Sequence, residues 1–62
     1  MRIRELRIKA GLTQSRLAQL LGQTQQAVAR WEAGEAMPRS DKLQQLAEIL
    51  GCSIDDLYRK DN

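Results

Sequence analysis

The sequence lacks most of the residues on which enzymes, metal sites and disulfides depend. Among its 62 residues there is no histidine and no phenylalanine, and cysteine, proline, tryptophan and tyrosine each occur once. One cysteine cannot form an internal disulfide, and one cysteine without histidine cannot supply the ligands of a zinc site. We therefore predict no metal and no cofactor, and the single Cys52 fits a reducing compartment.

Long apolar runs are also missing. No stretch approaches the ~20 residues of a membrane span, and residues 1–10 alternate charged and apolar side chains, which a secretory signal does not do. A glycine-rich phosphate loop is absent from the sequence as well. Asp55 and Asp56 are adjacent and would point about 100° apart on a helix, unlike a cooperating acid–base pair. We expect a cytoplasmic protein with no membrane partner and no enzymatic activity.

Composition predicts a single all-α domain. Leu, Ala, Gln, Arg and Glu are common while β-branched residues are few, a bias that favours helices over strands. A chain of this length is one domain, 1–62, and it buries only about 60% of the surface of its unfolded state. Such a domain needs an economical core or a partner.

Charge is distributed unevenly along the chain. Residues 1–30 hold six basic residues against one acidic residue, a net charge of +5, whereas residues 31–62 hold four against seven, a net charge of −3. A basic half can present one face to a polyanion. Ordinary solvated charge would give the same split.

Five helices are predicted when start and stop signals are combined with apolar periodicity. Each of the four glycines falls where a helix should end, and Thr13, Thr24 and Ser53 are candidate N-caps. Asp55 and Asp56 would lie in the first turn of the last helix, with Arg59 and Lys60 in its last turn. The predicted helices cover about 2–10, 14–21, 25–33, 40–50 and 54–60.

The stretch 14–33 is the most informative part of the chain. Only three residues, 22–24, join its two helices, and such a short turn containing glycine is typical of the helix-turn-helix unit. Ala18 provides a small side chain where the helices approach, and Gly22 tolerates the turn. The apolar wedge between the helices is predicted to contain Leu17, Leu21, Val28 and Trp31.

The helix over 25–33 has an outer face that could read DNA. With Val28 pointing to the core, a step of 100° per residue turns Gln26, Ala29 and Arg30 outward, and Gln25 is exposed at the helix start. Gln can bond the edge of adenine, Arg that of guanine, and Ala can contact a thymine methyl. An ordinary solvated helix face would carry the same residue types.

These residues belong to a longer pattern that resembles the Cro/repressor family of helix-turn-helix regulators, also called the XRE family. The 24–26 segment is similar to the recognition helices of lambdoid phage repressors. The resemblance implies a five-helix, lambda-repressor-like domain that binds a pseudo-palindromic operator in double-stranded DNA as a homodimer. It implies a repressor or other transcriptional regulator of bacterial or phage origin that is associated with the nucleoid. The pattern comprises Leu6-Arg7, Gly11-Leu12-Thr13-Gln14, Leu17-Ala18, Leu21-Gly22, Thr24-Gln25-Gln26, Val28, Trp31-Glu32, Gly34, Pro38, Leu46-Ala47 and Leu50-Gly51.

Phosphate contacts are expected on both sides of the reading helix, because they fix the position of the protein on the duplex. Helix N-termini offer N–H groups and hydroxyls to a phosphate, and the resemblance places Gln14 at such a contact, beside Gln25. The loop after Gly34 departs from the family pattern, since it reads Glu-Ala-Met where a basic loop is common. The predicted phosphate contacts are Thr13, Gln14, Ser15, Thr24, Arg39, Ser40 and Lys42.

Other residues receive structural interpretations. Glu32 lies near the buried side of its helix, where a carboxylate needs a partner, and the resemblance implies an ion pair with Arg7. Trp31 is interpreted as a core residue and Cys52 as a small buried hydrophobe.

Apolar residues beyond those that the core needs point to an interface. The candidate dimer surface is the last helix, with Ile54, Leu57 and Tyr58. The acidic half and the non-basic loop leave an alternative function open, an antitoxin or adaptor that binds a protein partner on the same fold. RNA binding is disfavoured because exposed aromatic residues suited to stacking bases are lacking.

Overall fold

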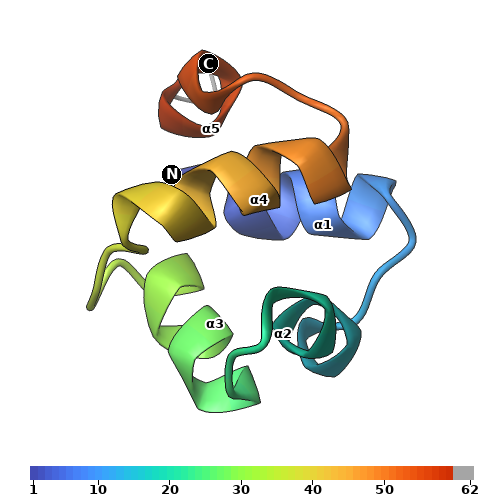
Figure 1. The fold of residues 1–62 in the computed structure, drawn as a ribbon, viewed down its shortest axis with the longest axis vertical. Helices are drawn as coiled ribbons and strands as arrows, with labels where there is room; N and C mark the ends of the chain where they lie inside the picture. Colours follow the sequence, from blue (N-terminus) through green and yellow to red (C-terminus); the bar gives the residue numbers. More distant parts are fainter. Residues whose placement is uncertain (60–62) are drawn as a thin grey trace.

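Five helices make up the fold in the computed structural model, which describes residues 1–59 (Figure 1). No strand occurs in this range, so the all-α class predicted from composition is confirmed. Within the same range, no helix has the length and apolar character needed to cross a bilayer. The helices are α1, Ile3–Lys9; α2, Gln14–Leu21; α3, Gln25–Glu32; α4, Ser40–Leu50; and α5, Ile54–Tyr58.

Three helices begin at a hydroxyl cap, as predicted. The Thr13 and Thr24 hydroxyls accept hydrogen bonds at 3.0 and 3.1 Å from the N–H three residues along the chain. The Ser53 hydroxyl accepts the Asp56 N–H, and the Asp56 carboxylate accepts the Ser53 N–H, both at 3.1 Å, which completes a capping box. Each bond satisfies a first-turn N–H that has no partner within the helix.

The helices α2 and α4 both end at a glycine in the left-handed conformation. Gly22 and Gly51 each have a φ of 67°, a backbone conformation that residues with a side chain adopt at a cost. Their N–H groups still bond to carbonyls of the helix they follow. The chain can therefore turn sharply after each helix without leaving these helix ends unsatisfied.

The first helix is one residue shorter than predicted at each end, and it carries a buried arginine. It covers Ile3–Lys9 rather than 2–10. Ala10 is exposed, whereas Arg7 faces inward with an exposed fraction of 9%. An arginine can be buried there because its guanidinium is paired, as described below.

The last helix is shorter than predicted. It ends at Tyr58, and Arg59 already has an extended backbone with φ −64° and ψ 137°. The expectation that Arg59 lies in the last helical turn is therefore wrong, and Lys60 lies outside the described residues. Asp55 and Asp56 do lie in the first turn, where negative charge suits the helix N-terminus.

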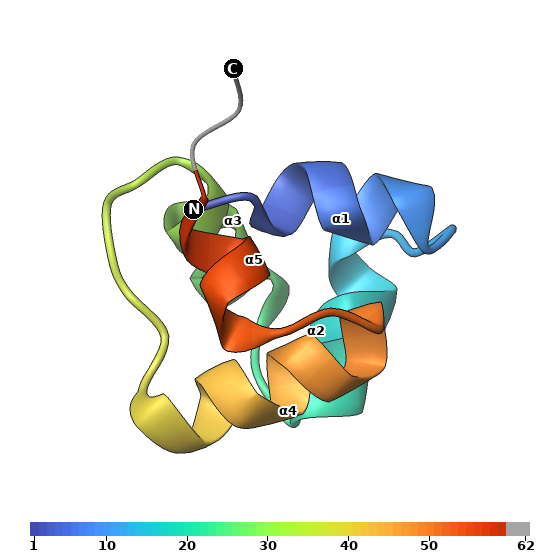
Figure 2. The ribbon, with the colours of Figure 1, turned by 90° about the horizontal axis from the view of Figure 1, so that it is seen from above.

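The helices are arranged in layers along the long axis of the molecule. In Figure 1, α2 and α3 lie at the bottom of the molecule, α5 at the top, and α1 and α4 between them. Figure 2 shows α5 lying across the space between α1 and α4. The core fills the interior with side chains from all five helices: Ile3, Leu17, Ala18, Leu21, Val28, Trp31, Leu43, Leu46, Ala47, Leu50 and Leu57.

The position of Leu57 corrects one prediction. Leu57 was expected on a dimer surface, but its exposed fraction is 0% and it belongs to the core. Its carbonyl also accepts the Arg2 N–H at 2.8 Å, which ties α5 to the start of the chain. The physical reason is that α5 covers the space between α1 and α4, so it must point an apolar residue inward.

Candidate nucleic-acid interface

Packing between α2 and α3 sets the geometry of the candidate interface. Three residues join the helices, and the left-handed Gly22 redirects the chain between them. Ala18 has an exposed fraction of 2%, as expected for a small residue at a close approach. The predicted wedge is confirmed, because Leu17, Leu21, Val28 and Trp31 are all buried in the core.

The outer side of α3 carries the four residues proposed to read bases. Gln25, Gln26 and Arg30 are exposed, and Ala29 is half-buried between them and the core side of the helix. The inner side carries Val28, with an exposed fraction of 0%. The helix therefore has one side that packs and one polar side that is free to meet a ligand.

The guanidinium of Arg30 remains available on this face. Its Nε lies 3.9 Å from the Glu35 carboxylate, and both side chains are about two-thirds exposed, at 62% and 66%. Exposed pairs at such separations are weak because water screens them. Because the pair is long and exposed, a base edge or a phosphate that accepts two hydrogen bonds from the guanidinium could displace Glu35.

At the start of α2, the predicted phosphate contacts Thr13 and Ser15 are exposed and Gln14 is half-buried. The Thr13 oxygen caps its own helix, as the Thr24 oxygen does on α3. The Gln14 side chain turns toward α3, where its Oε1 accepts a hydrogen bond from Gln25 Nε2 at 3.3 Å. The two glutamines thus lie side by side, as the resemblance implied.

Of the three phosphate contacts predicted at the start of α4, two are exposed and one has another partner. Arg39 and Ser40 are exposed at the helix start. Lys42 instead directs its ammonium to the Leu21 carbonyl at the end of α2, at 2.9 Å, and to Gln45 Oε1 at 3.5 Å. Lys42 therefore ties α4 to α2, and a positive charge suits the C-terminal end of a helix.

A buried ion pair supports the interface from behind. Arg7 Nε donates to Glu32 Oε2 at 2.7 Å and Arg7 Nη2 to Glu32 Oε1 at 3.2 Å, so the arginine binds the carboxylate with two nitrogens. Arg7 Nη1 also donates to the Leu12 carbonyl at 2.8 Å. The exposed fractions of the two side chains are 11% and 5%. The ion pair implied by the resemblance is present, and it joins α1 to α3.

Two contacts at this site were not foreseen from the sequence. Gln14 Nε2 donates to Glu32 Oε1 at 3.0 Å, and Lys42 donates to the end of α2. The polar residue at 14 and the lysine at 42 gave no sequence signal for these partners, because each contact joins residues far apart in the chain. Only the packing of the helices brings them together.

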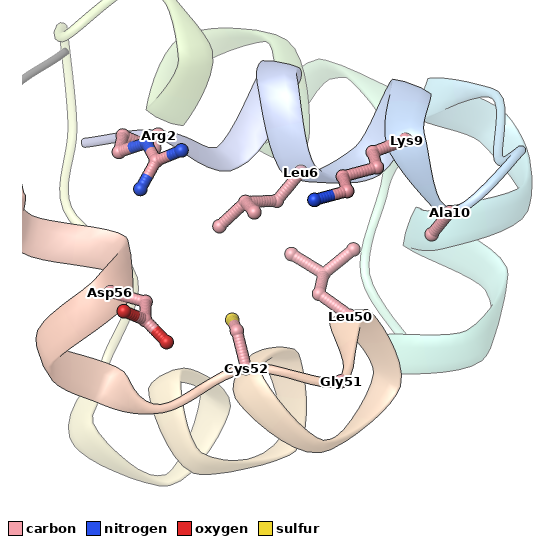
Figure 3. Close-up of a pocket in the computed structure, with 8 residues that line it drawn as sticks. All are labelled: Arg2, Leu6, Lys9, Ala10, Leu50, Gly51, Cys52 and Asp56. Atoms are coloured by element: carbon pink, nitrogen blue, oxygen red, sulfur yellow. The ribbon is translucent and has the colours of Figure 1, made fainter.

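A separate hollow lies between α1 and the connection from α4 to α5 (Figure 3). It has a volume of about 340 Å³ and receives the side chains of Arg2, Lys9 and Asp56. Cys52 was interpreted as a small buried hydrophobe; it packs against the core but is only half-buried. Burial, and then the charge of Asp56, raises the pKa of the thiol, which disfavours a reactive thiolate. Within residues 1–59, no group of three His, Cys, Asp or Glu side chains is placed to hold a metal ion.

Comparison with known proteins identifies the arrangement. Residues 3–57 match a family model described as Helix-turn-helix. The chain belongs to this XRE-type helix-turn-helix family. The family is one of DNA-binding transcriptional regulators, and the five-helix, lambda-repressor-like fold predicted from the sequence is confirmed.

Several curated proteins are similar to this helix-turn-helix chain. It is 38% identical over 58 residues to the SPbeta prophage-derived uncharacterized HTH-type transcriptional regulator YonR of Bacillus subtilis, covering 94% of this chain and 54% of that protein. It is 35% identical over 60 residues to Repressor protein C2 of Salmonella phage P22, covering 97% and 28%. It is 45% identical over 54 residues to the 26 kDa repressor protein of Escherichia phage HK022, covering 81% and 23%.

This helix-turn-helix chain is shorter than the relatives that it matches. It spans about half the length of the Bacillus regulator and less than a third of each phage repressor. No solved structure gives a significant match. The similarity therefore concerns the helix-turn-helix domain itself.

The remaining candidates for a dimer surface in this helix-turn-helix domain lie on α5, where Ile54 also packs against the core. Tyr58 has an exposed fraction of 51% and Ile54 is half-buried, whereas Leu57 is excluded by its burial. Tyr58 shares a shallow hollow with Met1 and Ile8, which are 40% and 57% exposed. The exposed apolar side chains near α5 thus come from three positions, two of them at the start of the chain.

Proposed function

We propose that this domain binds double-stranded DNA sequence-specifically, with α3 in the major groove, and acts as a transcriptional repressor. One observation carries the proposal: the outer side of α3 exposes Gln25, Gln26 and Arg30, while the opposite side is anchored in the core. The major groove admits an α-helix and shows a different pattern of donors and acceptors for each base pair. Amide and guanidinium groups can bond that pattern at two points.

Each exposed side chain has a base edge that it fits. Gln25 and Gln26 can each donate to N7 and accept from the N6 amino group of an adenine, and Arg30 can donate to O6 and N7 of a guanine. The half-buried Ala29 leaves room for a thymine methyl and for the helix backbone to approach. This set supports a reader of mixed A·T and G·C sequence.

Phosphate contacts would hold α3 in position. Thr13 and Ser15 at the start of α2 and Arg39 and Ser40 at the start of α4 are exposed, and helix N-termini attract anions. Thr24 and Gln14 complete the proposed set, whereas Lys42 is left out because its ammonium bonds to the end of α2. The loop after Gly34 adds no positive charge, so we expect fewer phosphate contacts than a basic loop would give.

We further propose that the domain binds a pseudo-palindromic operator as a homodimer. One recognition helix covers a short stretch of DNA, and two copies would reach half-sites about 34 Å apart, one helical turn along the duplex. The exposed apolar group around Tyr58 offers a surface for self-association that leaves α3 free.

Binding-site selection tests this function. Random duplexes would be selected with the protein, and fluorescence anisotropy would compare the selected site with variants at two salt concentrations. We expect Gln26→Ala and Arg30→Ala to relax preference at particular bases, each by about 1–3 kcal/mol. Gln44→Ala, which changes an exposed glutamine of α4, is the matched control and should leave preference unchanged.

A different outcome would favour the protein-interaction alternative. Two features support that alternative: Met37 in the non-basic loop is 58% exposed, and Ile8 on α1 is 57% exposed. If binding is independent of sequence and lost at modest salt, α3 does not read DNA, and an antitoxin or adaptor role on the same fold takes its place. Loss of function on substitution of Ile8 or Tyr58, with Gln26→Ala silent, would point the same way.

A further inference from the structure

A continuous chain of hydrogen bonds runs from the buried ion pair to the outer side of α3. Arg7 holds the Glu32 carboxylate at 2.7 and 3.2 Å, and Gln14 Nε2 donates to the same carboxylate at 3.0 Å. Gln14 Oε1 in turn accepts from Gln25 Nε2 at 3.3 Å. The chain begins at a carboxylate with an exposed fraction of 5% and ends at an exposed glutamine.

The charge of Glu32 determines the direction of every bond in this chain. An ionised carboxylate only accepts hydrogen bonds, so the Gln14 amide must turn its NH₂ group toward it. The Gln14 carbonyl oxygen then points the other way, and Gln25 can bond to it only by donating. A reversed Gln14 would place its carbonyl oxygen against the carboxylate, where two acceptors repel.

This direction fixes what Gln25 can offer to a ligand. One of its two N–H groups is used on Gln14, so the second N–H and the Oε1 oxygen remain. A donor and an acceptor side by side match N7 and the N6 amino group of an adenine. With the amide reversed, the two groups would exchange places and this match would be lost.

We propose that Glu32 is a positioning residue for DNA recognition. Its buried carboxylate orients the Gln14 and Gln25 amides, so that Gln25 selects adenine. The inference rests on the proposed function, since it concerns how α3 reads a base. It assigns to the ion pair a second role beside joining α1 to α3.

The test compares two variants that perturb the ion pair differently. The double variant Arg7→Met, Glu32→Leu removes both charges and fills the site with apolar side chains, an exchange that proteins often tolerate. It leaves the Gln14 amide without a charged acceptor. The matched control Arg7→Lys disturbs the ion pair but keeps the carboxylate, and therefore keeps the direction of the hydrogen bonds through Gln14 and Gln25.

The first measurement is made on the free protein. In ¹H–¹⁵N spectra, we expect the side-chain NH₂ signals of Gln14 and Gln25 to move in the double variant and to stay near their wild-type positions in Arg7→Lys. The second measurement is the binding ratio between the selected DNA site and sites with the adenine opposite Gln25 replaced. We expect about 5- to 150-fold preference for adenine in the wild type and Arg7→Lys, and its loss in the double variant.

The outcomes separate the two proposals. If the wild type prefers adenine and the folded double variant keeps that preference, the inference is wrong and the proposed function stands. If the wild type prefers no base at any position, both the proposed function and the inference are wrong. If the double variant does not fold, Gln14→Met is used instead. It removes the hydrogen bonds from Gln14 to Glu32 and from Gln25 to Gln14, and it leaves the ion pair intact. Loss of the adenine preference then supports the inference, and a uniform loss of affinity with the preference retained refutes it.

Discussion

The burial of Leu57 leads to a prediction about stability that separates a core role from an interface role. Leu57→Ala removes three carbons from a site with an exposed fraction of 0%. Transfer of those carbons to water is worth about 0.8 kcal/mol each, roughly 2.4 kcal/mol together, and the cavity left behind raises the cost to between about 2 and 5 kcal/mol. A domain of this size has a free energy of unfolding of only about 3 to 9 kcal/mol. The variant should therefore lose a large part of its stability.

Thermal unfolding followed by circular dichroism measures this loss. In a domain of this size, 1 kcal/mol lowers Tm by about 4–8 °C, so a loss of about 3 kcal/mol lowers it by about 12–24 °C. The matched control is Tyr58→Ala, which changes a half-exposed neighbour on the same helix and should lower Tm far less. The reasoning is refuted if Leu57→Ala melts like the wild type at low protein concentration and only its self-association is weakened.

Two further predictions concern helix ends. Gly22→Ala should destabilise the domain by about 1–2 kcal/mol in urea unfolding, because Gly22 has a φ of 67° while nothing crowds an added Cβ, so the cost is confined to the backbone. Hydrogen bonds from Ser53, first from its backbone N–H and then from its side chain, hold the pKa of Asp56 below its ordinary value. Because the pKa is depressed in the folded state, the ionised Asp56 stabilises the fold at pH values above the ordinary pKa near 3.9. This contribution is lost as the pH falls through the folded-state pKa. The stability difference between wild type and Asp56→Asn, measured by urea unfolding, should therefore shrink between about pH 5 and pH 2; a difference that does not change with pH would contradict the assignment.

Much of the candidate site could be predicted from the sequence because it depends on local rules. The caps Thr13 and Thr24 bond to N–H groups three residues away, and the outward positions of Gln26 and Arg30 follow from the helical period once Val28 is buried. The chemistry that these side chains can perform is likewise a property of their residue types. Whether they contact DNA stays a prediction.

Two contacts between distant residues were not foreseen from the sequence. The ammonium of Lys42 was expected at a phosphate, yet it bonds to the Leu21 carbonyl across the α2–α4 packing. The bond from Gln14 to Glu32 spans 18 residues. The apolar periodicity of the sequence reveals neither contact, because both depend on how helices that are separate in the chain pack against one another.

What the sequence determined alone is the number of helices, their caps, the glycine turns and the outward side of α3, since each follows from interactions within a few residues. The tertiary structure determined whether side chains with an ambiguous local pattern are buried or exposed. Leu57 and Tyr58 are adjacent apolar residues, and only the placement of α5 between α1 and α4 buries the first and exposes the second. The same packing turns Arg7 inward onto Glu32, because a buried charge is stable only where a partner from another helix meets it.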